Sequence, residues 1–217
     1  MYKNFLKGLL DFILSFFGII ILALPMLVIA VIIKIQDPGP VFFKQQRVGK
    51  GKKLFWLYKF RSMKVSTPKD VPTHLLENPE QYITKIGAFL RKTSLDELPQ
   101  IFNILCGKMS VIGPRPALWN QDDLIAEREQ YGANDVRPGL TGWAQINGRD
   151  ELEIPLKARL DGEYVERLGS SSINGIIMDV KCFIGTIKSV LKSEGVVEGG
   201  TGELERKEHE KETANVQ

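Results

Sequence analysis

The chain contains little of what histidine- or cysteine-centred chemistry requires. Its 217 residues include 2 histidines and 2 cysteines. His74 lies in a polar stretch and His209 in the charged C-terminal tail, so we expect neither a catalytic histidine nor a histidine-rich metal site. Cys106 and Cys182 are far apart, each within an apolar helical pattern. This spacing indicates buried thiols in a reducing compartment and argues against a disulfide framework or a zinc site.

Several well-known catalytic signatures are also missing. The sequence has no Gly-x-Ser-x-Gly elbow, no Walker A loop, no dinucleotide fingerprint and no internal repeat. Acidic residues are absent between Pro38 and Lys69, although the net charge of the whole chain is only +3. The cations of this basic region are Lys44, Arg47, Lys50, Lys52, Lys53, Lys59, Arg61, Lys64 and Lys69.

Two partners fit the basic region, which also carries Phe55, Trp56, Tyr58 and Phe60. Aromatic side chains among cations can stack on and clamp nucleic acid. They can equally lie at a membrane interface while the cations face anionic lipid headgroups. An apolar segment close by in the sequence favours the lipid interpretation.

That apolar segment predicts a membrane anchor. Residues 12–33 carry no charge and are long enough to cross a bilayer core, which needs about 20 apolar residues. No small-residue cleavage site follows, which argues against a signal peptide. Pro25 lies in the middle of the segment, where it removes a backbone donor and favours a kink or a break.

Two topologies are compatible with the anchor. Lysines flank both of its ends, so the positive-inside rule provides little asymmetry; they are Lys3, Lys7, Lys34 and Lys44. The helix either bends at Pro25 and returns to the cytoplasmic side, or spans the bilayer as an ordinary proline-kinked helix.

We expect three regions in the chain. Residues 1–36 form the membrane anchor, and residues 37–196 form the main domain. Residues 197–217 form a charged tail with too few apolar side chains to fold alone.

The fold class expected for the chain is α+β and mostly helical. Residues 41–46 and 53–60 are β-rich runs on either side of a glycine-containing turn, and they predict a small β-hairpin. Helical spacing predicts several amphipathic helices, at residues 83–91, 122–131, 156–168 and 174–193. The apolar stripe of the last helix fits either core packing or an in-plane position at the membrane interface.

The acidic pair Asp96-Glu97 is the leading candidate for catalysis. Ser94 is a potential N-cap, and Glu97 follows three residues later, as in a capping box. Apolar residues then recur at helical spacing up to Gly107, which predicts that Asp96 lies in the first turn of a helix. Free backbone N–H groups at such an end attract phosphate, but acidic residues also occur there simply as caps.

Four arginines strengthen the catalytic interpretation of this pair. Arg91, Arg115, Arg137 and Arg149 each lie beside proline, glycine or a helix start, where the backbone is constrained. Guanidinium forks held in this way suit diphosphate oxygens, although any single one could form a surface ion pair. Together with the acidic pair and the anchor, they indicate an anionic substrate used at a membrane.

Five stretches of the chain resemble the small monotopic phosphoglycosyl transferases. This bacterial sugar transferase family starts glycan assembly on a polyprenyl phosphate carrier. The stretches are residues 39–42 (GPVF), 58–63 (YKFRSM), 94–100 (SLDELPQ), 109–116 (MSVIGPRP) and 136–145 (VRPGLTGWAQ). They occur in the family's order, and the resemblance extends to about Gly195.

The resemblance implies roles for individual residues. Asp96 corresponds to the family's nucleophile, and Glu97 to its partner, which helps to hold Mg²⁺. Pro25 corresponds to the break of a re-entrant helix, although the family often has Ser-Pro where this chain has Leu24-Pro25. The residues expected to bind substrate are Lys59, Arg61, Arg91, Arg115, Arg137, Gln145 and Arg149.

The resemblance also implies a reaction. A sugar-1-phosphate passes from a UDP-sugar to polyprenyl (undecaprenyl) phosphate through a covalent aspartyl-phosphosugar, and UMP is released. This would be the first membrane step of capsule, exopolysaccharide or other glycoconjugate synthesis, at the cytoplasmic face of the bacterial cell membrane. The expected cofactor is Mg²⁺, and the expected partners are the bilayer and downstream glycosyltransferases, with no nucleic acid.

Two other classes of protein remain open on the residues alone. One is a membrane-anchored basic binding protein without catalysis, whose binding would depend strongly on salt. The other is a membrane phosphatase that acts through an aspartyl phosphate and needs no lipid acceptor.

Overall fold

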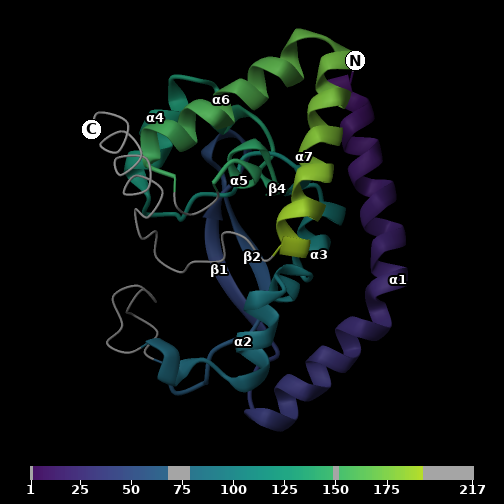
Figure 1. Ribbon diagram of the computed structural model, residues 1–217, viewed down its shortest axis with the longest axis vertical. Helices are drawn as coiled ribbons and strands as arrows, with labels where there is room; N and C mark the ends of the chain where they lie inside the picture. The colour runs from purple at the N-terminus through teal and green to yellow at the C-terminus, as the bar shows by residue number, and fades with distance from the viewer. Residues whose placement is uncertain (1, 68–78, 149–151, 193–217) are drawn as a thin grey trace, which may run out of the picture.

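The fold is α+β and mostly helical, as expected, in a computed structural model that describes residues 2–67, 79–148 and 152–192. Figure 1 shows a long helix along one side, with a β-hairpin and the shorter helices beside it. The helices are α1 (Lys7–Gln36), α2 (Lys85–Lys92), α3 (Gln100–Leu105), α4 (Asp122–Glu129), α5 (Trp143–Ile146), α6 (Ile154–Ser170) and α7 (Ser172–Lys192). The strands are β1 (Phe42–Val48), β2 (Leu54–Phe60), β3 (Ser110–Ile112) and β4 (Gly139–Thr141). Arg149 and the predicted tail, residues 197–217, lie outside the described residues, and the three-region division stays a prediction.

Helix α1 contacts the rest of the protein near both of its ends. At the N-terminal end, Asp11 Oδ1 accepts hydrogen bonds from Ser110 Oγ (3.0 Å) and the backbone N–H of Val111 (2.9 Å). At the C-terminal end, Ile29 and Ile33 are buried in a cluster with Phe60. A carboxylate on an apolar helix is costly unless it is paired, so Asp11 fixes which face of α1 turns toward the domain.

The outward face of α1 is apolar and exposed. It is long and apolar enough to cross a membrane by length and composition. The helix stays continuous through Pro25, and its C-terminal part curves under the domain (Figure 1). The role of Pro25 in returning the chain to the cytoplasmic side stays a prediction.

The β-hairpin is confirmed, and one face of its second strand is buried while the other is exposed. β1 and β2 pair antiparallel, with Phe43 opposite Lys59. Because side chains alternate along a strand, Phe55 and Leu57 are buried on one face while Trp56 is exposed on the other. The edge of β2 away from β1 is covered by the Asn103 side chain of α3, which accepts from the Tyr58 N–H (3.1 Å) and donates to the Trp56 carbonyl (2.8 Å).

A second sheet was not predicted. β3 and β4 pair in parallel over only three residues each. Glycines make the pairing possible, since a Cβ on Gly139 would lie 2.1 Å from the backbone nitrogen of Gly113. Two of the family-like stretches, 109–116 and 136–145, are therefore packed directly against each other.

Helix α7 resolves the two alternatives for its apolar stripe. Met178 and Cys182 are buried in the core with Tyr164 of α6. The stripe identified in the sequence lies on another face. Its members Ile176, Val180, Phe183, Ile184 and Ile187 are exposed, and its last member, Leu191, lies outside the side chains that the structure describes. Core packing is therefore wrong for this stripe, and the exposed face favours a position at a membrane interface.

The predicted capping box is wrong. Ser94 adopts a left-handed backbone (φ 57°) and its side chain makes no capping hydrogen bond. Leu95–Glu97 is a 3-10 turn, and α3 begins only at Gln100. The Glu97 side chain instead binds cations from β2 and the loop after β3, and those contacts outweigh a local cap. The predicted end at Gly107 is confirmed, because that residue has the positive φ (68°) that ends a helix.

Candidate active site

Asp96 and Glu97 are buried together in the turn before α3, each only 8% exposed. Glu97 Oε1 accepts hydrogen bonds from Lys59 Nζ (2.8 Å) and Arg115 Nη2 (2.9 Å). Asp96 Oδ2 lies 3.9 Å from the same Lys59 Nζ, which is an ion pair without hydrogen-bond contact. Three segments far apart in the sequence therefore meet at one acidic pair.

The two carboxylates have opposite pKa shifts. Burial raises the pKa of Asp96, and Lys59 is the largest opposing influence. Burial alone would also raise the pKa of Glu97, but Arg115 and Lys59 more than offset it and hold that pKa well below its usual range. Glu97 is thus a fixed anion that orders the cations, while Asp96 is a less stabilised and more basic carboxylate beside it.

Arg91 completes the cationic side of the site from the end of α2. Its Nε donates to Ser62 Oγ (2.7 Å), which orients the guanidinium. Burial lowers the pKa of Arg91, and the nearby Asp96 carboxylate opposes that change. Helix α2 is well defined at its start, where Thr84 Oγ1 accepts from the Gly87 N–H (2.9 Å).

Arg115 is held by the second sheet and by a residue that the sequence analysis did not single out. It follows Gly113 and Pro114, and the Pro114 carbonyl accepts from the Gly139 N–H (2.8 Å). Arg47 of β1 donates from Nη1 to the Pro116 carbonyl (3.0 Å), next to Arg115. The only signal for Arg47 in the sequence was its place in the basic region, because contacts to a backbone carbonyl leave no pattern of residue types.

The other residues expected to bind substrate are arranged differently. Arg61 forms an ion pair with Asp37, just after α1, and also donates to the Asp37 carbonyl. The Arg137 guanidinium lies against α1, with Nη1 3.2 Å from the point where a Cβ on Gly8 would stand. Gln145 donates to the Leu140 carbonyl (3.2 Å), and its buried Oε1 has no partner among the described residues. Their roles toward substrate stay predictions, as does that of Arg149.

The donor set at the site fits Mg²⁺ shared with a substrate. The described residues contain no group of three or more His, Cys, Asp or Glu side chains that could hold a metal alone. Mg²⁺ usually takes one or two carboxylates and completes its shell with water and substrate phosphate oxygens. Asp96 and Glu97 supply hard oxygen donors of this kind. A carboxylate has about four lone-pair positions, so Glu97 keeps capacity for a metal beside its two hydrogen bonds.

Comparison with known proteins places the chain in a family. The model of the family described as "Bacterial sugar transferase" matches residues 2–193. An uncharacterized sugar transferase, EpsL, from Bacillus subtilis (strain 168) is 39% identical over 191 residues, which cover 88% of this chain and 90% of that protein.

Two longer relatives have named activities. The UDP-glucose:undecaprenyl-phosphate glucose-1-phosphate transferase of Escherichia coli (strain K12) is 40% identical over 176 residues, covering 75% of this chain and 36% of that protein. The undecaprenyl-phosphate galactose phosphotransferase of Salmonella typhimurium is 33% identical over 207 residues, covering 89% of this chain and 42% of that protein. The chain thus spans about two fifths of the length of these two relatives. The family match covers all of the described residues, including every contact of the acidic pair, and the chain belongs to the bacterial sugar transferase family of phosphoglycosyl transferases.

Proposed function

We propose that the protein transfers a sugar-1-phosphate from a UDP-sugar to polyprenyl (undecaprenyl) phosphate. The observation that carries the proposal is the asymmetric pair of carboxylates. Asp96 has no close hydrogen-bonding partner among the described residues. Its neighbour Glu97, by contrast, is bound by two cations, Lys59 and Arg115. The named activities of the longer relatives support the same reaction class.

The first half of the reaction follows from the charges. The donor's diphosphate repels an attacking anion, and Lys59, Arg91 and Arg115 offset that charge around the acidic pair. An Asp96 oxygen attacks the sugar-bearing phosphorus, and the bond from that phosphorus to the UMP oxygen breaks. The products are an aspartyl-phosphosugar and UMP, which leaves with the bond's electron pair. Asp96 needs no histidine to deprotonate it near neutral pH.

The second half regenerates the enzyme. An oxygen of polyprenyl phosphate attacks the same phosphorus, and the bond to Asp96 breaks to restore the carboxylate. The lipid product carries a diphosphate linked to the sugar. When bound, Mg²⁺ would neutralise phosphate charge beside Glu97. Two half-reactions that share one covalent intermediate predict ping-pong kinetics.

The contacts of α1 support a cytoplasmic, one-sided attachment to the membrane. Lys7 Nζ near the start of α1 pairs with Asp179 of α7 (2.7 Å), and Ile33 near its end is buried against the same domain. A helix that crossed the full bilayer core would separate its ends by about 30 Å on opposite sides of the membrane. We therefore expect positions near Lys3 and Lys44 to be labelled from the same side. Labelling from opposite sides would show that the helix spans.

The reaction is tested by UMP release from a panel of UDP-sugars in membrane preparations, with Mg²⁺ and with or without polyprenyl phosphate. We expect lipid-dependent UMP release with at least one donor, abolished in Asp96→Asn. Asp122→Asn is a matched control, because Asp122 is exposed at the start of α4. A binding protein without catalysis would release no UMP, and a phosphatase would release inorganic phosphate without the lipid.

A further inference from the structure

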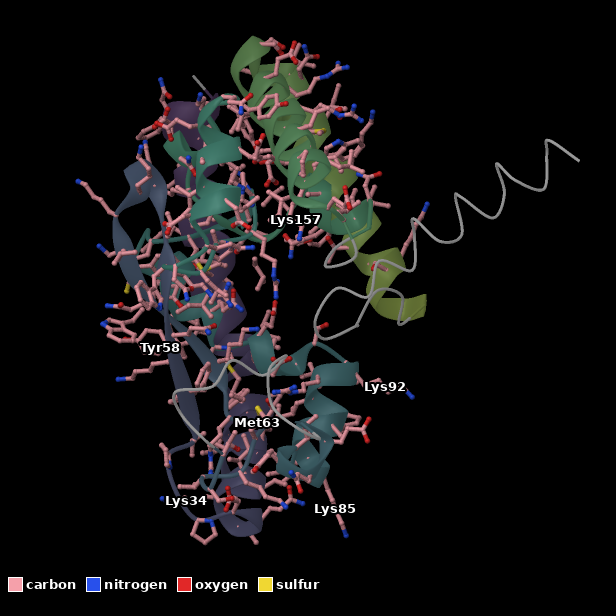
Figure 2. The ribbon with its side chains drawn as sticks, turned by 90° about the vertical axis from the view of Figure 1, so that its left-hand side faces the viewer. Lys34, Tyr58, Met63, Lys85, Lys92 and Lys157 are labelled. Atoms are coloured by element: carbon pink, nitrogen blue, oxygen red, sulfur yellow. The ribbon has the colours of Figure 1, made fainter. Side chains whose placement is uncertain are left out.

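The segment after β2 connects the end of α1 to the candidate active site. Arg61, the first residue after β2, is only 8% exposed, and its Nη1 forms an ion pair with Asp37 just after α1. Its Nη2 donates to the Asp37 carbonyl, and Asp37 Oδ2 also accepts from the Val65 N–H (2.8 Å). Figure 2 labels Met63, two residues after Arg61, in the same lower part of the molecule as Lys34 near the end of α1. Arg61 and Asp37 therefore fasten this segment to the end of α1.

The loop between α1 and β1 packs closely around the Arg61 guanidinium. The Arg61 N–H donates to the Val41 carbonyl (2.9 Å). A Cβ on Gly39 would lie 3.3 Å from Arg61 Nη1 and 2.6 Å from Val65 Cγ2, so a larger residue at this position would displace its neighbours. Both Nη atoms donate to Asp37 inside this loop, which gives the planar guanidinium one defined orientation.

Ser62, the next residue, is held against the start of α2. Its carbonyl accepts from the Thr84 N–H (3.0 Å) and from Thr84 Oγ1 (3.2 Å). A Cβ on Gly87 would lie 1.9 Å from that carbonyl oxygen, so the glycine is needed for α2 to pack this closely. The backbone of Ser62 is therefore fixed relative to α2 as well as to the end of α1.

The Ser62 hydroxyl faces Arg91 near the other end of α2. Arg91 Nε donates to Ser62 Oγ (2.7 Å), and Ser62 is only 8% exposed. Arg91 is in turn one of the cations that oppose the rise in the pKa of Asp96, and Asp96 opposes the fall in the pKa of Arg91. A continuous series of contacts thus leads from Asp37 through Arg61, Ser62 and Arg91 to Asp96.

We propose that Arg61 and Ser62 are positioning residues for the transfer reaction. Arg61 fixes the segment to the end of α1, and Ser62 sets the Arg91 guanidinium beside Asp96. The inference rests on the proposed function, and it gives Arg61 a role other than the substrate binding expected from the sequence. A cation stabilises a transition state best when its place is fixed in advance, and a displacement of about 1 Å can cost about 10²-fold in rate.

The first test asks whether Ser62 acts through Arg91. Exchange of labelled UMP into the UDP-sugar reports the first half-reaction and requires no lipid. We expect Ser62→Ala to lower the maximal exchange rate about tenfold and to change the KM for the UDP-sugar by less than about twofold, because orientation matters most in the transition state. Ser62→Thr keeps the hydroxyl and should restore the rate to within about threefold of the parent. In an Arg91→Ala background, Ser62→Ala should lower the rate by less than about twofold.

Ser15→Ala is the matched control, because it makes the same change at another buried serine. Ser15 is 2% exposed, and its hydroxyl donates to the Phe12 carbonyl within α1 (3.0 Å). We expect this variant to leave the exchange rate within about twofold, both in the parent and in the Arg91→Ala background.

The second test asks whether Arg61 acts through the end of α1. Asp37→Asn keeps the shape of the side chain and an oxygen acceptor, but it removes the charge that holds Arg61. We expect the exchange rate per folded molecule to fall about fivefold with an unchanged KM for the UDP-sugar. In a Ser62→Ala background the same change should cost less than about twofold, because the two residues act on the same guanidinium. The melting temperature in detergent separates these effects from a loss of folded protein.

Each outcome decides the inference. Equal rate losses from Ser62→Ala in the parent and in the Arg91→Ala background would overturn it, since the hydroxyl would then not act through Arg91. A raised KM for the UDP-sugar in Arg61→Lys, with no effect of Asp37→Asn, would also overturn it and would show that Arg61 binds the donor. Absence of UMP exchange in the parent protein would instead refute the proposed function itself.

Discussion

Two buried aspartates of this protein have very different surroundings. Asp161 of α6 is 1% exposed, and Arg128 of α4 donates to its Oδ2 from both Nε (2.8 Å) and Nη2 (2.5 Å). Asp96 is 8% exposed, and the nearest ion-pair partner among the described residues is the Lys59 Nζ at 3.9 Å. Burial raises the pKa of both carboxylates, and cations oppose the rise in both. Asp161 is therefore held by a guanidinium, whereas Asp96 has no such hydrogen bond among the described residues.

This difference in contacts separates a structural charge, Asp161, from the proposed nucleophile, Asp96. A buried ion pair with close hydrogen bonds holds α4 and α6 together, and the loss of either partner leaves an unpaired charge. The cations near Asp96 make their close contacts with its neighbour Glu97. A buried carboxylate in this position is costly for folding, but it is suited to chemistry on an anion.

The largest effect is expected for Asp96, the proposed nucleophile. Asp96→Asn should lower the rate at which labelled UMP exchanges into the UDP-sugar by at least about 10³-fold, because an amide is a poor nucleophile. The protein should remain folded, since Asp96 accepts no hydrogen bond from the described residues. Exchange rates and the melting temperature in detergent check both parts. If the variant were inactive and also strongly destabilised, the main role of Asp96 would be structural, like that of Asp161.

The structural pair should show the reverse. Asp161→Asn leaves the Arg128 guanidinium buried without its counter-charge, which typically costs about 3–5 kcal/mol of unfolding free energy. For a chain of this size, the melting temperature should fall by roughly 6–20 °C. The exchange rate per folded molecule should stay close to that of the parent. A change in the UMP exchange rate without a change in melting temperature would contradict a structural role for Asp161.

A smaller effect is expected where α1 contacts β3. Asp11→Ala removes the acceptor for Ser110 Oγ and the Val111 N–H, and hydrogen bonds to a charged group contribute about 1.5–3 kcal/mol. The melting temperature in detergent should therefore fall in Asp11→Ala. Ser110→Ala is the control, because it removes one of the two donors and should cost less than Asp11→Ala.

The smallest effect is expected for an exposed pair. Lys52 and Glu129 are 3.0 Å apart, but their side chains are 53% and 57% exposed. Such pairs contribute about 0–1 kcal/mol, so Lys52→Ala should leave the melting temperature and exchange nearly unchanged. A drop comparable to that of Asp161→Asn would mean that burial does not separate the strong pairs from the weak ones.

The sequence predicted much of the candidate site because its residues lie in compact motifs. The acidic pair, Lys59, Arg91 and Arg115 were all expected near one substrate, and the structure brings them together. The hairpin and α7 were also predicted, because their periodicity extends over many residues.

The rest depended on contacts between distant segments. β3 and β4 have three residues each, too few for a strand pattern, and they pair only because Gly113 and Gly139 allow their backbones to approach. Arg47 acts through a backbone carbonyl, and the partners of Asp11 are 99 and 100 residues away. The capping box failed for a related reason, since two distant cations bind the Glu97 side chain more strongly than a local N–H.

The most direct test of the account is the mass of the protein after incubation with Mg²⁺ and a UDP-sugar that supports UMP release, without lipid acceptor. We predict an increase equal to one sugar phosphate, located on Asp96, lost when polyprenyl phosphate is added and absent from Asp96→Asn. Full turnover by Asp96→Asn, or an adduct on a different residue, would contradict the central claim that Asp96 is the nucleophile.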